Sequence, residues 1–193
     1  TNYVNIDLML QHPVKELIWV GKRSDIQDRN DWTNYTNWVY EDQPPFNQKY
    51  LETFDYKNIN TKGFYPHISS NLFLESQQDN IKYKFLKKDI IKTTDFLLNG
   101  MYRFRDKTSK YFNQIQNYQH YKKNIKPGIH MYSFSLNPTK YQPSGSCNMS
   151  RINKISIRFD INEIPYSNQY SQYYYEYDFN IYTINYNIFR IMG

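Results

Sequence analysis

Two stretches of this chain alternate between apolar and polar residues. In residues 4–10 every second residue is valine, isoleucine or leucine, and the residues between them are mostly polar. The pattern returns in residues 154–161, where isoleucine and phenylalanine alternate with lysine, serine, arginine and aspartate. Because successive side chains of a β-strand point to opposite faces, this period of two predicts strands with one buried face.

Three further stretches predict strands: residues 17–20, 129–136 and 179–192. The last has apolar residues on both faces, with Tyr182 and Ile184 on one and Phe179 and Ile181 on the other. Such a strand is expected to be covered on both sides, by another sheet and by a loop or a neighbouring molecule.

The composition favours strands over helices. Alanine, the strongest helix former, is absent from all 193 residues, whereas there are 21 tyrosines and 12 phenylalanines. No long stretch keeps a helical stripe; residues 81–98 come nearest, and short helical turns are expected there or around residues 111–118. Strands joined by long connections predict an antiparallel β-sandwich.

A chain of this length fits one domain, which we place at residues 1–193. Residues 41–80 form its least regular segment, broken by Pro44, Pro45, Gly63 and Pro66. A loop this long predicts an insertion with its own function or a partner-binding arm. The start at Thr1, without a methionine or a leader, suggests a piece of a longer protein.

The positive charge is concentrated in one part of the chain. Residues 80–126 carry twelve Lys and Arg against three Asp, so the net charge of this segment is +9. The rest of the chain has a net charge of −3, which gives the total of +6. Such a segment could contact nucleic acid, an anionic glycan or an acidic neighbour. Solvated loops and strand edges guarded by lysine are the favoured interpretation. No nucleic-acid-binding motif accompanies it, so no direct nucleic-acid partner is predicted.

The residue types that could catalyse a reaction or bind a metal are scattered along the sequence. The four histidines form no HxH or HExxH motif, and Cys147, the single cysteine, has no CxxC partner. A small buried thiol is a better interpretation of Cys147 than a nucleophile. Two carboxylate pairs could suggest a glycosidase, but such pairs are common on surfaces: Asp25 with Asp28, and Asp89 with Asp95. We predict no enzyme activity, no cofactor and no metal. No transmembrane segment is predicted either, because no stretch approaches 18 consecutive apolar residues.

Residues 142–152 read Gln-Pro-Ser-Gly-Ser-Cys-Asn-Met-Ser-Arg-Ile. Pro143 fixes φ, Ser144 can bond to the local backbone and Gly145 permits positive φ, so a tight bend is expected. Arg151 carries a planar charged group suited to holding loop carbonyls or a carboxylate. Two roles remain open for Pro143, Ser144, Gly145, Cys147 and Arg151. They could hold the turn in place, or they could contact a neighbouring subunit.

Two triplets satisfy the N-glycosylation pattern, at Asn34 and Asn148. Such triplets also arise by chance in a chain rich in asparagine. Both are retained as candidate glycosylation sites.

The segment at residues 142–152 resembles the signature of the major capsid proteins of large icosahedral DNA viruses, which reads QPSGTCNFSRI in its usual form. Asn117 stands where that family usually has proline, and residues 41–80 have no counterpart in it. Further blocks resemble the family in the same order: HPVKELIWV at 12–20, NYT at 34–36, DFLLNG at 95–100, RF at 103–104, YF with QNYQH at 111–120, PGI with MYSFSLNP at 127–138, and NYNIFRIM at 185–192.

The resemblance implies an all-β fold, an antiparallel eight-stranded jelly-roll sandwich with long loop insertions. Members carry two consecutive jelly rolls, and these blocks belong to the C-terminal one. It further implies a homotrimer with a pseudo-hexagonal outline that tiles the outer capsid shell, contacts minor capsid proteins and assembles in the host cytoplasm, where the two sequons would stay unused. The insertion is expected on the capsid exterior.

Two alternatives remain open. The first is a minor capsid paralogue, which would keep the same motifs. The second is a carbohydrate-binding, lectin-like jelly roll in which exposed aromatic residues stack on sugars, although fold alone is weak evidence for that function. The candidate stacking residues are Trp32, Trp38 and residues 173–175.

Overall fold

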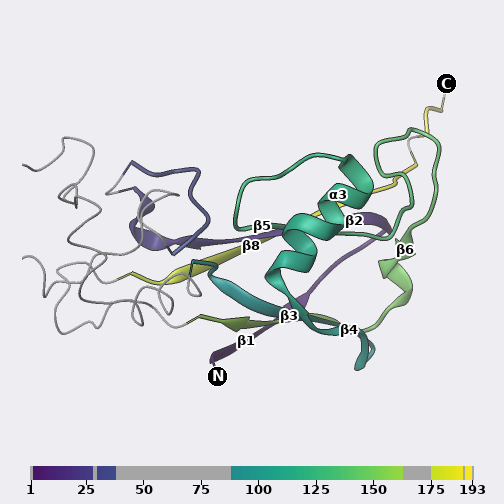
Figure 1. Cartoon of the computed structure of the whole chain (residues 1–193). Helices are drawn as coiled ribbons and strands as arrows, with labels where there is room; N and C mark the ends of the chain where they lie inside the picture. The colour runs from purple at the N-terminus through teal and green to yellow at the C-terminus, as the bar shows by residue number, and fades with distance from the viewer. Residues whose placement is uncertain (1, 28–29, 38–87, 163–174, 189, 193) are drawn as a thin grey trace, which may run out of the picture.

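The computed structural model describes residues 2–27, 30–37, 88–162, 175–188 and 190–192. They form two antiparallel sheets packed face to face (Figure 1). The insertion predicted at residues 41–80 lies outside the described residues. The first sheet has the order β1 (Asn2–Leu8), β7 (Ile155–Ile161), β3 (Ile91–Leu98) and β4 (Met101–Thr108).

The long strand β2 (Pro13–Arg23) is the centre of the second sheet. The strand β8 (Tyr177–Asn185) pairs with β2 along one edge. On the other edge β2 pairs first with β5 (Ile129–Ser133) and then, near its start, with the short β6 (Cys147–Asn148). Two 3₁₀ turns extend this layer, η1 (Ser24–Ile26) after β2 and η5 (Met149–Arg151) after β6.

Each of the five stretches predicted as strands overlaps a strand in the structure, but their ends differ. The stretch at 179–192 stops at Asn185, and the one at 17–20 extends in both directions. The helical turns expected around 111–118 are confirmed as a π-helical turn, η4 (Tyr111–Ile115), and α3 (Gln116–Tyr121).

Of the two places where helical turns were expected, residues 81–98 form none in their described part, because residues 91–98 are the strand β3. This strand lies between β7 and β4, and its residues 94–97 are all buried. A strand covered on both faces lacks the alternation that reveals a strand in sequence. The edge strand β4 was also not predicted, because Phe104 is its one buried residue.

The core is built largely from aromatic rings. Trp19 of β2 lies at its centre, 4.9 Å from the Phe112 ring and 6.5 Å from the Phe159 ring between ring centroids. Phe96 and Phe104 stack on the other sheet, and Tyr132 of β5 faces Phe104 at 4.9 Å. The core thus uses the aromatic-rich composition that the sequence shows.

The helical segment closes one side of the sandwich, between β4 and β5. Phe112 of η4 is fully buried and contacts rings from both sheets. α3 then follows across the outer face of the second sheet, where the Tyr121 hydroxyl donates to both carboxylate oxygens of Glu16 at 2.8 Å. Burial and the Glu16 carboxylate raise the pKa of Tyr121, so this phenol stays a donor.

Candidate functional site

The motif loop, which we define as residues 134–152, is held by Ser144. Its Oγ accepts a hydrogen bond from the Asn137 backbone N–H at 2.9 Å and lies 2.7 Å from the Ser135 Oγ. Its carbonyl accepts from the Leu136 N–H at 3.3 Å. The Lys15 ammonium of β2 donates to the Pro138 carbonyl at 2.7 Å, which ties the loop to the sheet. Pro143 itself is exposed at the bend.

Gly145 has a φ of +139°, and a Cβ placed on it would lie 2.6 Å from the Phe134 carbonyl oxygen. A side chain at this position would therefore collide with backbone that belongs to the same loop. The chain bends at residues 140–142, directly before Pro143, and a tight bend made by Pro143, Ser144 and Gly145 themselves stays a prediction.

The second half of the loop docks on the start of β2. Cys147 pairs with Val14, and the Met149 backbone N–H donates to the His12 carbonyl at 3.1 Å. The Ser150 hydroxyl accepts from the His12 N–H at 2.8 Å. Cys147 is half-buried against the core, and burial raises the pKa of its thiol, so it is a poor nucleophile at neutral pH.

Arg151 is exposed on the surface of the loop. Within the described part of the chain, no hydrogen bond or ion pair holds its guanidinium, so the expected hold on loop carbonyls is not seen there. Ser144 performs the locking instead. The subunit contact expected for Arg151 stays a prediction.

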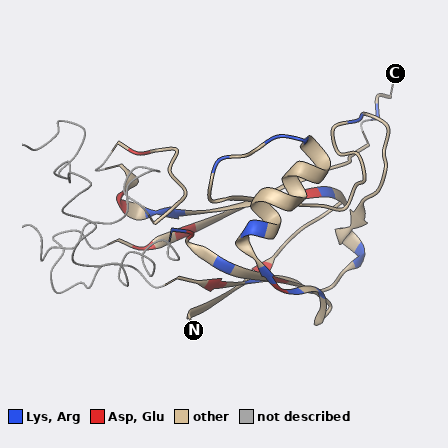
Figure 2. Ribbon diagram, viewed as in Figure 1, with Lys and Arg blue, Asp and Glu red and all other residues tan. Residues whose placement is uncertain are grey.

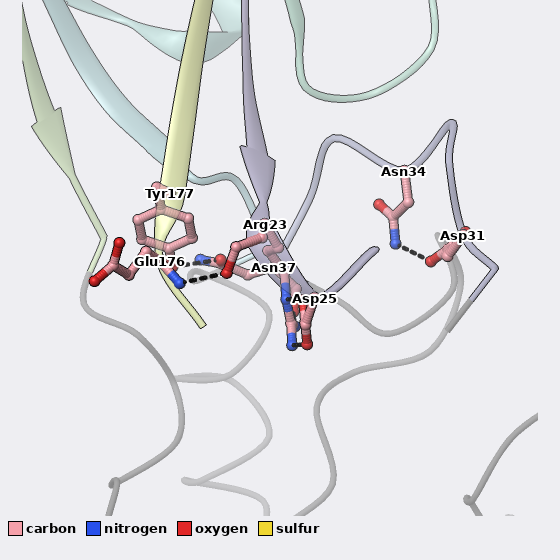
Figure 3. A network of polar contacts seen from close by, with 8 residues as sticks. Arg23, Asp25, Asp31, Asn34, Asn37, Glu176 and Tyr177 are labelled. Atoms are coloured by element: carbon pink, nitrogen blue, oxygen red, sulfur yellow. Dashed lines mark hydrogen bonds and ion pairs between the residues drawn. The ribbon is translucent and has the colours of Figure 1, made fainter. Parts of the chain in front are cut away.

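A buried polar network lies at the end of β2 (Figure 3). Arg23 donates from Nε and Nη2 to the two Asp25 carboxylate oxygens at 2.9 and 2.6 Å, and both side chains are about 95% buried. Arg23 Nη1 also donates to the Asn37 carbonyl at 2.9 Å. Its guanidinium lies 3.6 Å from the centroid of the Tyr175 ring, a cation–π contact.

The same network joins chain segments that are distant in sequence. The Tyr177 hydroxyl donates to the Asn37 side-chain oxygen at 2.5 Å, and the Asn37 N–H donates to the Lys88 carbonyl at 2.8 Å. Asn162 donates from its side chain to the Asp89 carbonyl at 2.6 Å. The described segment that ends at Asn37 is thus tied to the one that begins at Lys88, and Asn162 bonds back to the start of its own segment. The sequence pattern did not reveal this network, because most of its contacts join residues that are distant in sequence, such as Asn37 and Tyr177 or Arg23 and Tyr175. Only Arg23 and Asp25 lie close together in the sequence.

The two glycosylation candidates have different surroundings. Asn34 is buried, its amide nitrogen donates to Asp31 at 2.7 Å, and its oxygen accepts from the Thr36 N–H and hydroxyl. Asn148 is exposed. Glycosylation of either residue stays a prediction.

His130 is buried in the core, stacked on Trp19, with its Nε2 2.6 Å from the Ser109 hydroxyl. Burial lowers its pKa from 6.5 to about 4, so the ring is neutral at physiological pH. Both oxygens of Asp25 accept from Arg23, while Asp28 lies outside the described residues. In the described part of the chain no group of three or more His, Cys, Asp or Glu could hold a metal ion. No helix there is long and apolar enough to cross a membrane.

Lysine and arginine residues gather over β3, β4 and the start of the helical segment (Figure 2). On the edge strand β4, Arg103, Arg105 and Lys107 are exposed, and the strand carries two irregularities in its register with β3. Asp106, with a φ of +49°, turns its N–H to the Asp95 carboxylate at 2.6 Å. Charges and bulges are the features that keep an edge strand from pairing with other chains, in agreement with the guarded-edge interpretation.

Antiparallel sheets that pack face to face define the class of β-sandwich proteins, to which the jelly rolls of viral capsids and lectins belong. The family model described as "Large eukaryotic DNA virus major capsid protein" matches residues 1–193. The chain therefore belongs to this family.

Curated relatives agree with that assignment. The major capsid protein of Phaeocystis pouchetii virus is 39% identical over 96 residues, which cover 50% of this chain and 18% of the relative. The probable capsid protein 4 of Acanthamoeba polyphaga mimivirus is 33% identical over 119 residues, covering 62% of this chain and 22% of the relative. The chain thus spans about a fifth of these relatives.

Two solved structures share the fold. The Faustovirus major capsid protein aligns over 96% of this chain and 32% of its own, with a TM-score of 0.55 and 12% identity. A chain of the PBCV-1 virus capsid aligns over 82% of this chain and 33% of its own, with a TM-score of 0.52 and 21% identity. The predicted class, an all-β antiparallel jelly-roll sandwich, is confirmed. The total of eight strands stays a prediction, because parts of the chain lie outside the described residues.

Proposed function

We propose that this chain is part of a structural virion protein that forms homotrimeric, pseudo-hexagonal capsomers of an outer icosahedral shell. The observation that carries the proposal is the match of a capsid family over all 193 residues. The locked motif loop supports it, because a rigid loop keeps its surface in one shape for a neighbouring subunit. The expected interface buries roughly 2,000 Å² or more.

The partners of the proposed protein are copies of itself, neighbouring capsomers and minor capsid proteins, and the site of assembly is the host cytoplasm. The role is structural and not catalytic. Three observations on the described residues support this view: the half-buried thiol of Cys147, the neutral buried ring of His130, and the engagement of Asp25 with Arg23.

We place the insertion at residues 41–80 on the capsid exterior. The described chain stops at Asn37 and resumes at Lys88, and a hydrogen bond joins these two residues at one end of the sandwich. Surface loops can grow at such a point without disturbing the sheets. Limited proteolysis of intact virions is expected to cut within 41–80, and virions in which this segment is never cut would contradict the placement.

The lectin-like alternative loses one of its candidate residues. Tyr175 is buried under Arg23 and cannot stack on a sugar. Trp32 is 53% exposed and donates from its indole to Asn30, while Trp38, Tyr173 and Tyr174 lie outside the described residues. A single exposed tryptophan favours no sugar site over an ordinary surface residue.

The amount of the protein in purified virions separates a shell protein from a minor paralogue. Quantitative mass spectrometry of virions is expected to find it among the most abundant proteins. A few copies per particle would instead identify a vertex or fibre-associated paralogue. Absence from the particle would overturn the structural role altogether.

A further inference from the structure

The hairpin between β3 and β4 turns on two residues, Asn99 and Gly100. Leu98 pairs with Met101, so only these two residues form the loop. Asn99 has a φ of +50° and Gly100 a φ of +81°. Two-residue hairpin loops with positive φ at both positions are type I′ turns, for which Asn-Gly is a preferred sequence. Both residues are exposed.

Asn99 also fastens this turn to the residues that follow the motif loop. Its backbone N–H donates to the Lys154 carbonyl at 2.8 Å. Its side-chain oxygen, Oδ1, accepts from the backbone N–H groups of Asn153 and Lys154 at 3.0 and 3.1 Å. Asn153 and Lys154 lie between the end of the motif loop and β7. The side-chain amide of Asn99 is therefore held against this junction.

Residues 99 and 100 also form the one Asn-Gly dipeptide in the sequence, because every other asparagine is followed by a residue with a side chain. In an Asn-Gly dipeptide the glycine nitrogen can attack the side-chain amide carbon of the asparagine, since no Cβ hinders its approach or restricts its backbone. The space beside Gly100 is open, because a Cβ placed on it would have no atom within 4 Å. Neighbouring atoms therefore leave room for this reaction.

We propose that Asn99 is a site of spontaneous deamidation, and that the hydrogen bonds from Asn153 and Lys154 keep the reaction slow in the folded protein. The Gly100 nitrogen gives its proton to hydroxide and forms a bond to Asn99 Cγ. The bond between Cγ and the side-chain nitrogen then breaks, and this nitrogen takes a proton from water and leaves as ammonia. Water opens the resulting succinimide ring at either carbonyl, which gives aspartate or isoaspartate.

The two hydrogen bonds to Oδ1 oppose the first step. Closing the succinimide ring rotates the Asn99 side chain and the Gly100 peptide towards each other, and this rotation separates Oδ1 from its two N–H donors. Two hydrogen bonds of ordinary net strength correspond to a slowing of roughly thirtyfold. The reaction is therefore expected to be slow while the hairpin is docked and to speed up when it separates from Asn153 and Lys154.

The product matters for the motif loop because isoaspartate routes the backbone through the former side chain. The turn then contains one more backbone atom, and Oδ1 no longer lies between Asn153 and Lys154 as a side-chain acceptor. Isoaspartate at residue 99 is therefore expected to release the end of the motif loop from the hairpin. Aspartate, the other product, keeps a side-chain oxygen in this place.

Peptide mapping of the full-length protein tests the proposal. The protein is incubated at one mildly alkaline pH and one temperature, folded in buffer and unfolded in urea, and the mass change from amide to acid is followed for each asparagine peptide. We expect Asn99 to be the fastest asparagine in the unfolded chain and to give both aspartate and isoaspartate. In the folded protein it should react at least about tenfold more slowly. Equal rates in the two states, a faster asparagine elsewhere in the unfolded chain, or aspartate as the sole product would each overturn the proposal.

Two substitutions at Lys154 test the role of the hydrogen bonds. Lys154→Pro removes one of the two N–H donors to Oδ1, and Lys154→Ala is the matched control because it removes only an exposed side chain. With both variants shown by circular dichroism to be folded, Lys154→Pro should deamidate roughly fivefold faster than the parent protein, and Lys154→Ala at the parent rate. A parent-like rate in folded Lys154→Pro would refute protection by these hydrogen bonds. The comparison of folded with unfolded parent protein decides the proposal even where Lys154→Pro does not fold.

Discussion

Arg23 shows how a single residue at the end of a strand organises distant parts of the chain. Its guanidinium is buried, paired with Asp25, bonded to the Asn37 carbonyl and stacked on Tyr175. A charge in such a place is tolerated because each part of the guanidinium has a partner. Removing one partner while keeping the other is therefore far more damaging than removing an exposed charge.

Asp25→Asn is expected to lower the free energy of unfolding by about 3 kcal/mol, because Arg23 is then buried without its counter-charge. Asp106→Asn is the matched control, since Asp106 pairs with Arg105 in an ion pair in which both side chains are about two-thirds exposed. It should cost less than about 0.5 kcal/mol. Urea unfolding of both variants measures the difference, and equal costs would contradict a stabilising role for the buried pair.

The buried ring of His130 predicts a pH-dependent stability. The unfolded chain binds a proton near pH 6.5, whereas folded His130 does so near pH 4. The unfolded state therefore holds more protons between these values, and stability falls as the pH falls. From pH 7 to pH 5 the loss is about 2 kcal/mol. Urea unfolding at both pH values should show this loss in the parent protein and in His120→Gln, but not in His130→Gln. An unchanged loss in His130→Gln would assign it to other groups.

At the scale of the elements, the sequence predicted the strands that have one buried face. β1 and β7 alternate because one face of each is packed against the core and the other is polar. β3 was not predicted because it is covered on both faces, and β4 was not predicted because its residues are mostly exposed and charged. The contribution of neighbouring strands to burial is a tertiary property, which a local pattern does not contain.

The candidate site was predictable to a similar extent. Residues 142–152 could be singled out, and the backbone preferences of Pro143, Ser144 and Gly145 predict a bend there. The roles inside the loop could not be derived, because Ser144 bonds to residues outside the 142–152 motif and Met149 bonds to His12. The Arg23 network was missed for the same reason.

Gly145→Ala tests the rigidity of the motif loop. The added Cβ would lie 2.6 Å from the Phe134 carbonyl oxygen, so the loop backbone must move. Gly100→Ala is the matched control, because Gly100 also has a positive φ of +81° but no atom within 4 Å of an added Cβ. We expect a cost of about 1 kcal/mol for Gly100→Ala and at least about 1 kcal/mol more for Gly145→Ala, measured by thermal unfolding. Equal losses of stability in the two variants would show that the loop backbone moves easily to make room for the added Cβ.

At the scale of the whole molecule, the chain combines a guarded edge at β4 with a locked motif loop that leaves Arg151 exposed. A guarded edge limits unwanted strand pairing, and a loop held in one shape can present the same surface to each neighbouring subunit. The fold and the proposed shell function are consistent in this respect.

Arg151→Glu is expected to leave the unfolding free energy within about 0.5 kcal/mol of the parent, because the side chain is exposed. Assembly of capsomers into shells should nevertheless fail or slow, since a charge reversal at a subunit contact is repulsive. Lys154→Glu, an exposed charge reversal three residues away, is the control. Light scattering of assembling capsomers reports the effect, and normal assembly of Arg151→Glu would remove this residue from the subunit contact.

The central claim is that the parent protein builds a capsid shell from trimers, and its native mass tests this most directly. The full-length protein is measured by native mass spectrometry, and the same sample is imaged at low resolution. Three copies per particle with a pseudo-hexagonal outline are expected. A stable monomer that binds glycan would contradict it and would make Trp32 the first residue to substitute.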